Sequence, residues 1–266
     1  MNNEILKNFH LYALRREKKL NPVTQLYFNL FGFPVLGKHL RLKILLPMIK
    51  SDLKKINSAL DVGCGLGEFS LLLAGENRHV IAIDASSKTL NILADYSKSQ
   101  SFDIKTQLCD LNHNLEISRK FDAVLCIAVL DYLKDPEKFL KTTASLVNPG
   151  GVYYLGIPLK TRKTYLPYEK IADARTLHQG FDINWLQKTM GREGWRIVFV
   201  KKYLPFNLFY HMSKSIFFLT KLGISYENAM ALLYPLFLGL ASVCQLIFPS
   251  IGTEAIIKFE KNNGKQ

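Results

Sequence analysis

The chain has 266 residues, 48% hydrophobic and 21% charged, which is an ordinary composition for a globular protein that buries a core. Its four cysteines are widely scattered without a CxxC pair, so a disulfide framework is excluded as an interpretation and no metal site is expected. The first twenty residues lack the unbroken apolar run of a signal peptide, which together with the cysteines favours a cytoplasmic protein.

The net charge of +13 is unevenly distributed along the chain. Residues 1–58 carry a net +8, residues 59–150 a net −3 and residues 151–266 a net +8. Basic flanks around a mildly acidic middle favour an anionic partner for the flanks, either a membrane surface or a nucleic acid. Solvated charge on exposed helices is the alternative explanation.

The first part of the chain reads as two helices. Apolar residues recur at helical spacing over residues 4–19 and again over residues 37–56. Pro47 lies within the second of these segments and is expected to kink that helix or restart it. We interpret residues 1–57 as an N-terminal helical extension.

From residue 58 onward, short apolar runs alternate with helical segments, a pattern typical of a parallel sheet covered by helices on both faces. The predicted strands are 58–63, 79–84, 104–109, 121–128, 151–157, 196–204 and 254–260. The predicted helices are 67–75, 87–99, 136–147 and 182–193. The fold class is therefore an α/β, Rossmann-like seven-stranded sheet, with its core at 58–205 and its last strand and tail at 254–266.

Residues 206–253 form an apolar insertion between the last two strands, far longer than a hairpin turn requires. Its stretch from Asn228 to Thr253 contains no charged residue and is long enough to span a membrane. A span would need a second crossing, and the only candidate is short and contains Lys214 and Lys221. We prefer a helical hairpin that lies on the membrane surface or covers a hydrophobic pocket. The alternative is that its helices pack against the N-terminal helices as a separate hydrophobic core.

A glycine-rich turn follows the first predicted strand, in the segment 59-ALDVGCGLGEFSLLLA-74. Gly63, Gly65 and Gly67 allow positive φ and let backbone N–H groups approach a ligand. The third glycine arrives one residue earlier than in the G-x-G-x-x-G turn of dinucleotide-binding enzymes. Asp61, two residues before the first glycine, is placed to meet the cation of a methionine moiety.

Two further acidic residues end the next two strands. Asp84 follows Gly67 by 17 residues, a position from which a carboxylate accepts hydrogen bonds from ribose hydroxyls. Asp110 ends the third strand and is predicted at the edge of an adenine, with Leu111 against the face of that ring. Together these motifs predict a site for an adenosine-containing cofactor between residues 59 and 110.

These motifs resemble the class I, seven-stranded S-adenosylmethionine-dependent methyltransferases, in particular the bacterial group that includes quinone-biosynthesis methyltransferases. The stretch 121–158 is similar to the fourth strand, helix and fifth strand of that group, including its Asn-Pro-Gly-Gly turn at 148–151. The resemblance implies S-adenosylmethionine as cofactor, and it adds Cys64, Ala85 and Ile127 to the predicted cofactor-binding residues.

Three residues are candidates for assisting the chemistry. Many relatives carry Glu-His after the fourth strand, whereas this chain has Asp131 and Tyr132, which keep a carboxylate near the cofactor and a ring to position an acceptor. His178 lies in a loop that crosses the substrate pocket in similar proteins, and we predict it as the base. A turn cap for Asp131, packing on adenosine for Tyr132 and an ordinary surface position for His178 are the alternatives.

The predicted activity is methyl transfer to a hydrophobic small-molecule or lipid acceptor at the inner face of the membrane, with the enzyme peripheral on an anionic surface. Nucleic acid is an unexpected substrate, because neither an Asn/Asp-Pro-Pro-Tyr/Phe pattern nor a Pro-Cys pair follows the fourth strand. A soluble small-molecule methyltransferase with a structural insertion and an inactive cofactor-binding module remain alternatives. The sequence leaves the acceptor, the methylated atom and the oligomeric state open.

Overall fold

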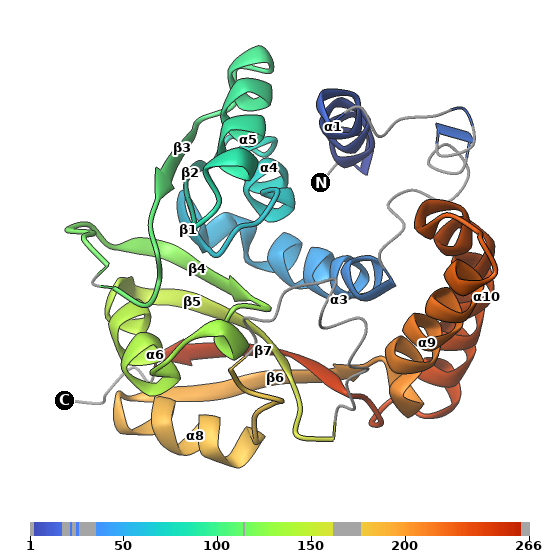
Figure 1. Ribbon diagram of the computed structural model, residues 1–266. Helices are drawn as coiled ribbons and strands as arrows, with labels where there is room; N and C mark the ends of the chain where they lie inside the picture. Colours follow the sequence, from blue (N-terminus) through green and yellow to red (C-terminus); the bar gives the residue numbers. More distant parts are fainter. Residues whose placement is uncertain are drawn as a thin grey trace.

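The seven predicted strands form a single sheet in the computed structural model, which describes residues 3–17, 22, 25–26, 36–113, 115–161 and 177–261 (Figure 1). The strands are β1 (Ser58–Val62), β2 (His79–Asp84), β3 (Ile104–Leu108), β4 (Phe121–Ile127), β5 (Val147–Pro158), β6 (Trp195–Tyr203) and β7 (Glu254–Lys261). Most of their bounds agree with the predicted ranges to within a residue or two. The exception is β5, which begins four residues early and includes the Asn-Pro-Gly-Gly segment.

The sheet has the order β3-β2-β1-β4-β5-β7-β6. The first five strands are parallel to one another, and β7 is antiparallel to both of its neighbours, β5 and β6. This arrangement confirms the predicted Rossmann-like sheet. The strand order reverses direction between β1 and β4, and such a reversal opens a crevice at the carboxyl ends of the strands where ligands bind.

Helices cover both faces of this sheet (Figure 1). Alternate residues of β1 point into different cores: Ala59 lies in the core beneath α3, whereas Leu60 and Val62 lie in the core beneath α6 and α8. The helices of the core are α4 (Glu68–Ala74), α5 (Ser87–Ser99), α6 (Pro136–Ser145) and α8 (Ile183–Arg192). Ser86, Asp135 and Asp182 cap the last three, each accepting a backbone N–H in the first turn.

The N-terminal extension contributes α1 (Asn3–Arg16) and α3 (Leu36–Asp52). Of the two outcomes expected at Pro47, a kink or a restart of the second helix, the restart is wrong, because α3 continues past this residue. Leu45 and Ile49 on either side of Pro47 are fully buried, and this packing holds the helix although proline donates no backbone hydrogen bond there. The predicted end of the first helix, at residues 18–19, lies outside the described residues.

The insertion forms a helical hairpin of α9 (Leu208–Lys221) and α10 (Tyr226–Ile247), which stands beside α3 (Figure 1). One side of α10, with Tyr234, Phe237 and Ala241, shares a core with Leu36 and Leu40 of α3. One side of the hairpin is therefore buried, as the alternative of a hydrophobic core predicts. The other side is apolar and exposed.

Candidate functional site

The three glycines of the turn between β1 and α4 have two different roles: two are required for packing, and one leaves open space. All three have positive φ, with values of 67°, 57° and 82° for Gly63, Gly65 and Gly67. A Cβ at Gly63 would lie 2.3 Å from Cγ2 of Val129, and one at Gly67 would lie 2.5 Å from a methyl of Leu93, so these two positions require glycine for packing. Nothing lies within 4 Å of a Cβ at Gly65, which faces open space.

The open space beside Gly65 is a cavity of about 350 Å³ at the carboxyl ends of β1 and β4. Seven predicted site residues line it together: Asp61, Gly63, Cys64, Gly65, Ile127, Asp131 and Tyr132. The predicted cofactor turn and the predicted catalytic turn therefore meet around one hollow. The described lining does not include Gly67, Asp84, Ala85, Asp110, Leu111 or His178.

Asp61 lines this cavity and is almost fully buried. Burial raises the pKa of its carboxyl to about 7, although Ser70 donates a hydrogen bond of 2.7 Å from Oγ to Oδ2, which opposes the shift. A cation beside Asp61 would favour the ionised carboxylate. The residue therefore fits the positively charged methionine end of S-adenosylmethionine, and Gly65 leaves room for the ligand to approach the backbone.

Asp84 ends β2 and shapes the glycine turn. Its Oδ2 accepts a hydrogen bond of 2.8 Å from the backbone N–H of Gly65, and its Oδ1 accepts one of 2.9 Å from Ser86. The neighbouring Ala85 is exposed. The carboxylate thus holds the turn as well as standing where the ribose of the cofactor is expected.

Replacing Asp84 with alanine is expected to weaken S-adenosylmethionine binding by about 1.5–3 kcal/mol, the usual contribution of hydrogen bonds to a charged group. Calorimetry with S-adenosylhomocysteine and with its 2′-deoxy analogue separates the two roles of the carboxylate. If Asp84 contacts the ribose directly, the substitution should cost less affinity for the deoxy analogue than for S-adenosylhomocysteine. Equal losses of affinity for the two ligands would mean that Asp84 only holds the glycine turn. Unchanged affinity in a folded variant would contradict both.

Asp110 and Leu111 lie away from the cavity. Asp110 is exposed, and the N–H of Asn112 donates to its Oδ1 at 2.9 Å, an interaction that lowers the pKa of the carboxyl. Leu111 lines a separate hollow of about 190 Å³ beside α6. The structure therefore does not bring this pair together with Asp61, and their predicted contacts with adenine stay a prediction.

The candidate catalytic residues gather at a short turn, η2 (Leu130–Tyr132), after β4. Asp131 is buried and Tyr132 is partly exposed, and both line the cavity. The backbone N–H groups of Leu177 and His178 donate to the carbonyl of Asp131 at 2.7 and 3.1 Å. Leu177 and His178 are therefore fixed to the turn that carries Asp131.

The His178 ring is not part of the described lining of the cavity. Its Nε2 lies 2.9 Å from the carbonyl oxygen of Leu133, which can only accept, so this nitrogen carries the proton and donates. Nδ1 is left as the nitrogen with a lone pair. A role as base therefore requires Nδ1 to face the acceptor.

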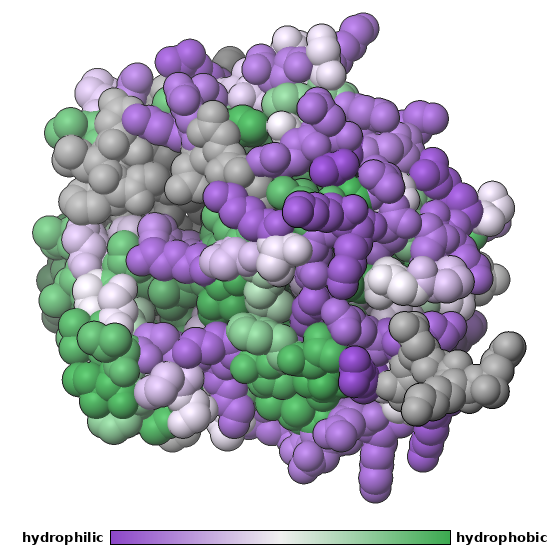
Figure 2. All heavy atoms as spheres, turned by 180° about the vertical axis from the view of Figure 1, so that it is seen from behind, coloured by the Kyte–Doolittle hydropathy of each residue, from purple (hydrophilic) through white to green (hydrophobic). Residues whose placement is uncertain are grey.

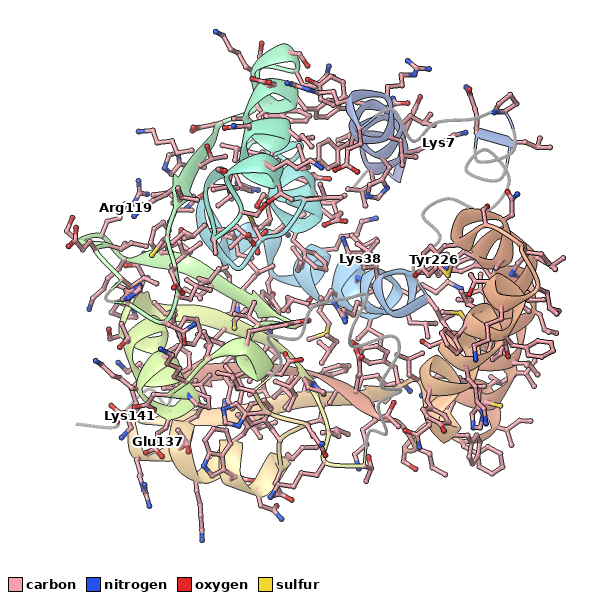
Figure 3. The ribbon with its side chains drawn as sticks, viewed as in Figure 1. Lys7, Lys38, Arg119, Glu137, Lys141 and Tyr226 are labelled. Carbon is pink, nitrogen blue, oxygen red and sulfur yellow. The ribbon has the colours of Figure 1, made fainter. Side chains whose placement is uncertain are left out.

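Four charged residues line the cavity that the sequence did not predict there: Lys38, Arg41, Glu68 and Glu254. Lys38, labelled on α3 in Figure 3, donates to Glu68 at 2.6 Å, and Arg41 donates to Glu254 at 3.2 Å. Burial alone would raise the pKa of Glu68, but Lys38 and His10 outweigh it and lower that pKa. Two ion pairs therefore fasten α3 over the cavity.

Comparison with known proteins gives a family match for part of the chain that carries this site. Residues 60–155 match the family model described as a methyltransferase domain. The ubiquinone biosynthesis O-methyltransferase of Coxiella burnetii is 30% identical over 107 residues, which are 40% of this chain and 46% of that protein. The enzyme of the same name from Caulobacter vibrioides is 36% identical over 105 residues, covering 39% and 42%. The chain thus matches less than half the length of these two relatives.

Solved structures agree on the fold. A protein from Galdieria sulphuraria described as a sarcosine dimethylglycine methyltransferase has a TM-score of 0.60 at 14% identity, covering 91% of this chain and 97% of its own. The 4+2 cyclase SpnF has a TM-score of 0.55 at 16% identity, covering 82% and 81%. With the family match, the sheet and the cavity beside the glycine turn, residues 60–155 form a class I, Rossmann-like, S-adenosylmethionine-dependent methyltransferase domain.

Proposed function

We propose that this protein transfers the methyl group of S-adenosylmethionine to a hydrophobic, quinone- or lipid-like acceptor, and that it works as a peripheral protein on the cytoplasmic face of a membrane. The methyltransferase domain and its cavity support the reaction. The proposed membrane association rests on the apolar outer face of the helical hairpin.

The outer face of α10 is a stripe of exposed leucine and valine. It consists of Leu232, Leu236, Leu240, Val243 and Leu246, spaced three or four residues apart, and the last of them is 83% exposed. Hydrophobic side chains gather along the left margin of Figure 2, the side on which the hairpin lies when the molecule is seen from behind. A contiguous apolar surface of this kind marks a membrane or protein contact.

One described helix, over Asn228–Ile247, is long and apolar enough to cross a membrane. Its partner α9 has 14 residues, about 21 Å of helix, which is shorter than the roughly 30 Å of bilayer hydrocarbon. The chain must return to the sheet after α10, because β6 and β7 are paired neighbours. A hairpin that lies in the membrane surface, with its outer face toward the lipid, requires neither a full crossing by α9 nor an exit on the other side of the membrane.

The acceptor is proposed from the relatives and the turn after β4. The matching Coxiella and Caulobacter proteins are O-methyltransferases of ubiquinone biosynthesis by name, and a quinone precursor is a hydrophobic molecule with hydroxyl groups. The cofactor supplies a methyl group on a sulfonium with a good leaving group, so alignment and exclusion of water contribute most of the acceleration. A hydroxyl acceptor must also lose its proton. The candidates to accept it are Asp131, which lines the cavity, and His178, whose backbone N–H donates to the carbonyl of Asp131.

Two other functions remain candidates on specific observations. A soluble small-molecule methyltransferase with a structural hairpin is favoured by the burial of Tyr234, Phe237 and Ala241 against α3. A module that binds the cofactor without methyl transfer is favoured by Asp131-Tyr132 in place of Glu-His and by the similar fold of a cyclase. Liposome binding distinguishes the first from our proposal, and turnover distinguishes the second.

The wild-type protein is expected to float with anionic liposomes, detach partly at high salt, and bind neutral liposomes weakly. Changing Leu232, Leu236 and Leu240 to serine should remove the fraction that resists salt, because apolar insertion is insensitive to screening. Phe237 lies in the same apolar stretch but is unsuitable for this test, because it is buried in the core and its loss is expected to destabilise the hairpin. Flotation in a density gradient measures the result.

Leu108→Ser is the matched control, since this leucine is equally exposed but lies on β3, the far edge of the sheet. It should leave flotation unchanged. A wild-type protein that ignores liposomes would support the soluble enzyme. Transfer of a tritiated methyl group from the cofactor into a solvent-extractable product of membrane lipids tests the reaction itself, and no transfer to any acceptor would favour the inactive module.

A further inference from the structure

A second hollow, of about 650 Å³, lies where the hairpin leaves the sheet and returns to it. Leu159 and Lys160, directly after β5, line one part of it, and Lys202 of β6 lines another. Phe206, in the short turn η3 (Pro205–Asn207) after β6, and Ile251 of the returning chain complete the lining that matters here. The described lining shares no residue with the cofactor cavity, which touches Pro158 and Glu254 instead. We call this hollow the hairpin groove.

The hairpin groove is positively charged. Lys160 and Lys202 line it, and neither takes part in an ion pair among the described residues. The carboxylate in its described lining, Asp182, accepts hydrogen bonds from Asn184 and Trp185 as the cap of α8, at 2.7 and 3.3 Å. The two ammonium groups therefore present charge to the groove that the protein itself balances only in part.

The mouth of the groove is apolar. Phe206 and Ile251 in its wall are 48% and 40% exposed, and the ring of Phe206 meets that of Phe248 edge-on at 5.3 Å between centroids. Phe248 directly follows α10, whose last turn exposes Leu246 and Ile247. The rim is thus continuous with the outer face of α10.

The wall between groove and hairpin is tightly built. Gln245 donates from Nε2 to the carbonyl of Lys202 at 3.0 Å, which ties the end of α10 to β6. A Cβ at Gly252 would lie 2.4 Å from backbone atoms of Tyr203, so the returning chain lies directly against β6. The lysines and the apolar rim are therefore held in a fixed relation to each other.

From this arrangement we infer that the hairpin groove binds the phosphate of an anionic phospholipid between Lys160 and Lys202, with the acyl chains against Phe206, Phe248 and Ile251. An ammonium group binds phosphate as a point charge, and an apolar rim next to it suits a molecule with a charged head and hydrocarbon tails. A free phosphate would leave the rim uncovered. The inference rests on the proposed membrane association and adds a specific lipid site to it.

The test uses dihexanoyl phosphatidylglycerol as a monomer in solution, titrated into the full chain by calorimetry. Fluorescence of Trp185 is a second readout, because its ring stacks on Phe181 of the groove wall at 5.6 Å between centroids. Saturable binding is expected. The double change Lys160→Gln and Lys202→Gln should weaken it by at least about tenfold, the size expected for losing hydrogen bonds to a charged group.

The double change Lys214→Gln and Lys221→Gln is the matched control. It removes the same charge from exposed positions of α9, outside the groove, and should leave monomer binding unchanged. Dihexanoyl phosphatidylcholine and glycerol phosphate should both bind much more weakly than the anionic lipid. Both double variants should keep wild-type thermal stability and cofactor affinity, since no described cofactor-cavity residue is altered.

Equal binding of glycerol phosphate would overturn the inference by making the groove a site for a soluble anion. Equal losses in the two double variants would overturn it by reducing the lysines to general surface charge. A wild type that floats with anionic vesicles but binds no monomeric lipid would overturn the lipid site and leave the proposed function standing. A wild type that neither floats with anionic vesicles nor binds monomeric lipid would overturn both the lipid site and the proposed membrane association.

Discussion

Replacing His178 with alanine is expected to lower kcat by about 10²–10⁴-fold while leaving the affinity for S-adenosylmethionine nearly unchanged, the usual effect of removing a general base. The fold should tolerate the change. The loop is held by two backbone hydrogen bonds to the carbonyl of Asp131, and neither involves the imidazole. Steady-state kinetics at saturating acceptor, with cofactor affinity from calorimetry, measures the result.

His178→Gln distinguishes a base from a positioning side chain. Its amide can still donate to the carbonyl of Leu133, as Nε2 does now, but it has no basic nitrogen to replace Nδ1. A base predicts that the glutamine variant is as slow as the alanine variant. Recovery of activity with glutamine would show that the histidine only orders the loop, and full activity of both would make it an ordinary surface residue.

The affinity for S-adenosylmethionine is expected to rise about tenfold per pH unit below pH 7 and to level off above it, a change of roughly 100-fold from pH 5 to pH 8. Burial raises the pKa of Asp61 to about 7, so below this pH the carboxyl is mostly protonated and neutral. Binding of a cationic methionine end must then expel the proton. Calorimetry across this pH range, in buffers with different ionisation enthalpies, measures both the affinity and the released proton.

Asp61→Asn is the control for this pH dependence. The variant should bind the cofactor as weakly as the protonated wild type and show a nearly flat profile. The same raised pKa has a consequence without cofactor: the folded chain holds a proton that the unfolded chain has lost, so this carboxyl makes folding less favourable as pH rises from 3.8 to about 7. A flat wild-type affinity profile would mean that the carboxylate does not face the cation.

Much of the fold could be predicted because its signals are local. Buried parallel strands are short apolar runs, and turn residues separate them from amphipathic helices, so the bounds of β2 and α5 were predicted to the residue. The glycine turn and Asp61 are also local, since one strand and the turn that follows it position both. These parts of the site needed no information about distant residues.

The roof of the cavity could not be predicted for the opposite reason. Lys38 pairs with Glu68 thirty residues later, and Arg41 pairs with Glu254 at a separation of 213 residues. The local spacing of these residues predicts neither contact. The buried side of α10, which includes Phe237, could not be predicted either, because a helix that is apolar all round carries no periodic signal of which side is buried.

The place of β7 has a consequence for how the chain is made. This strand lies between β5 and β6 in the sheet, yet it is synthesised after both and after the whole hairpin. At about 5–20 residues per second, the roughly fifty residues of the insertion delay β7 by several seconds. During that time the edge of β5 is unpaired and open to wrong partners.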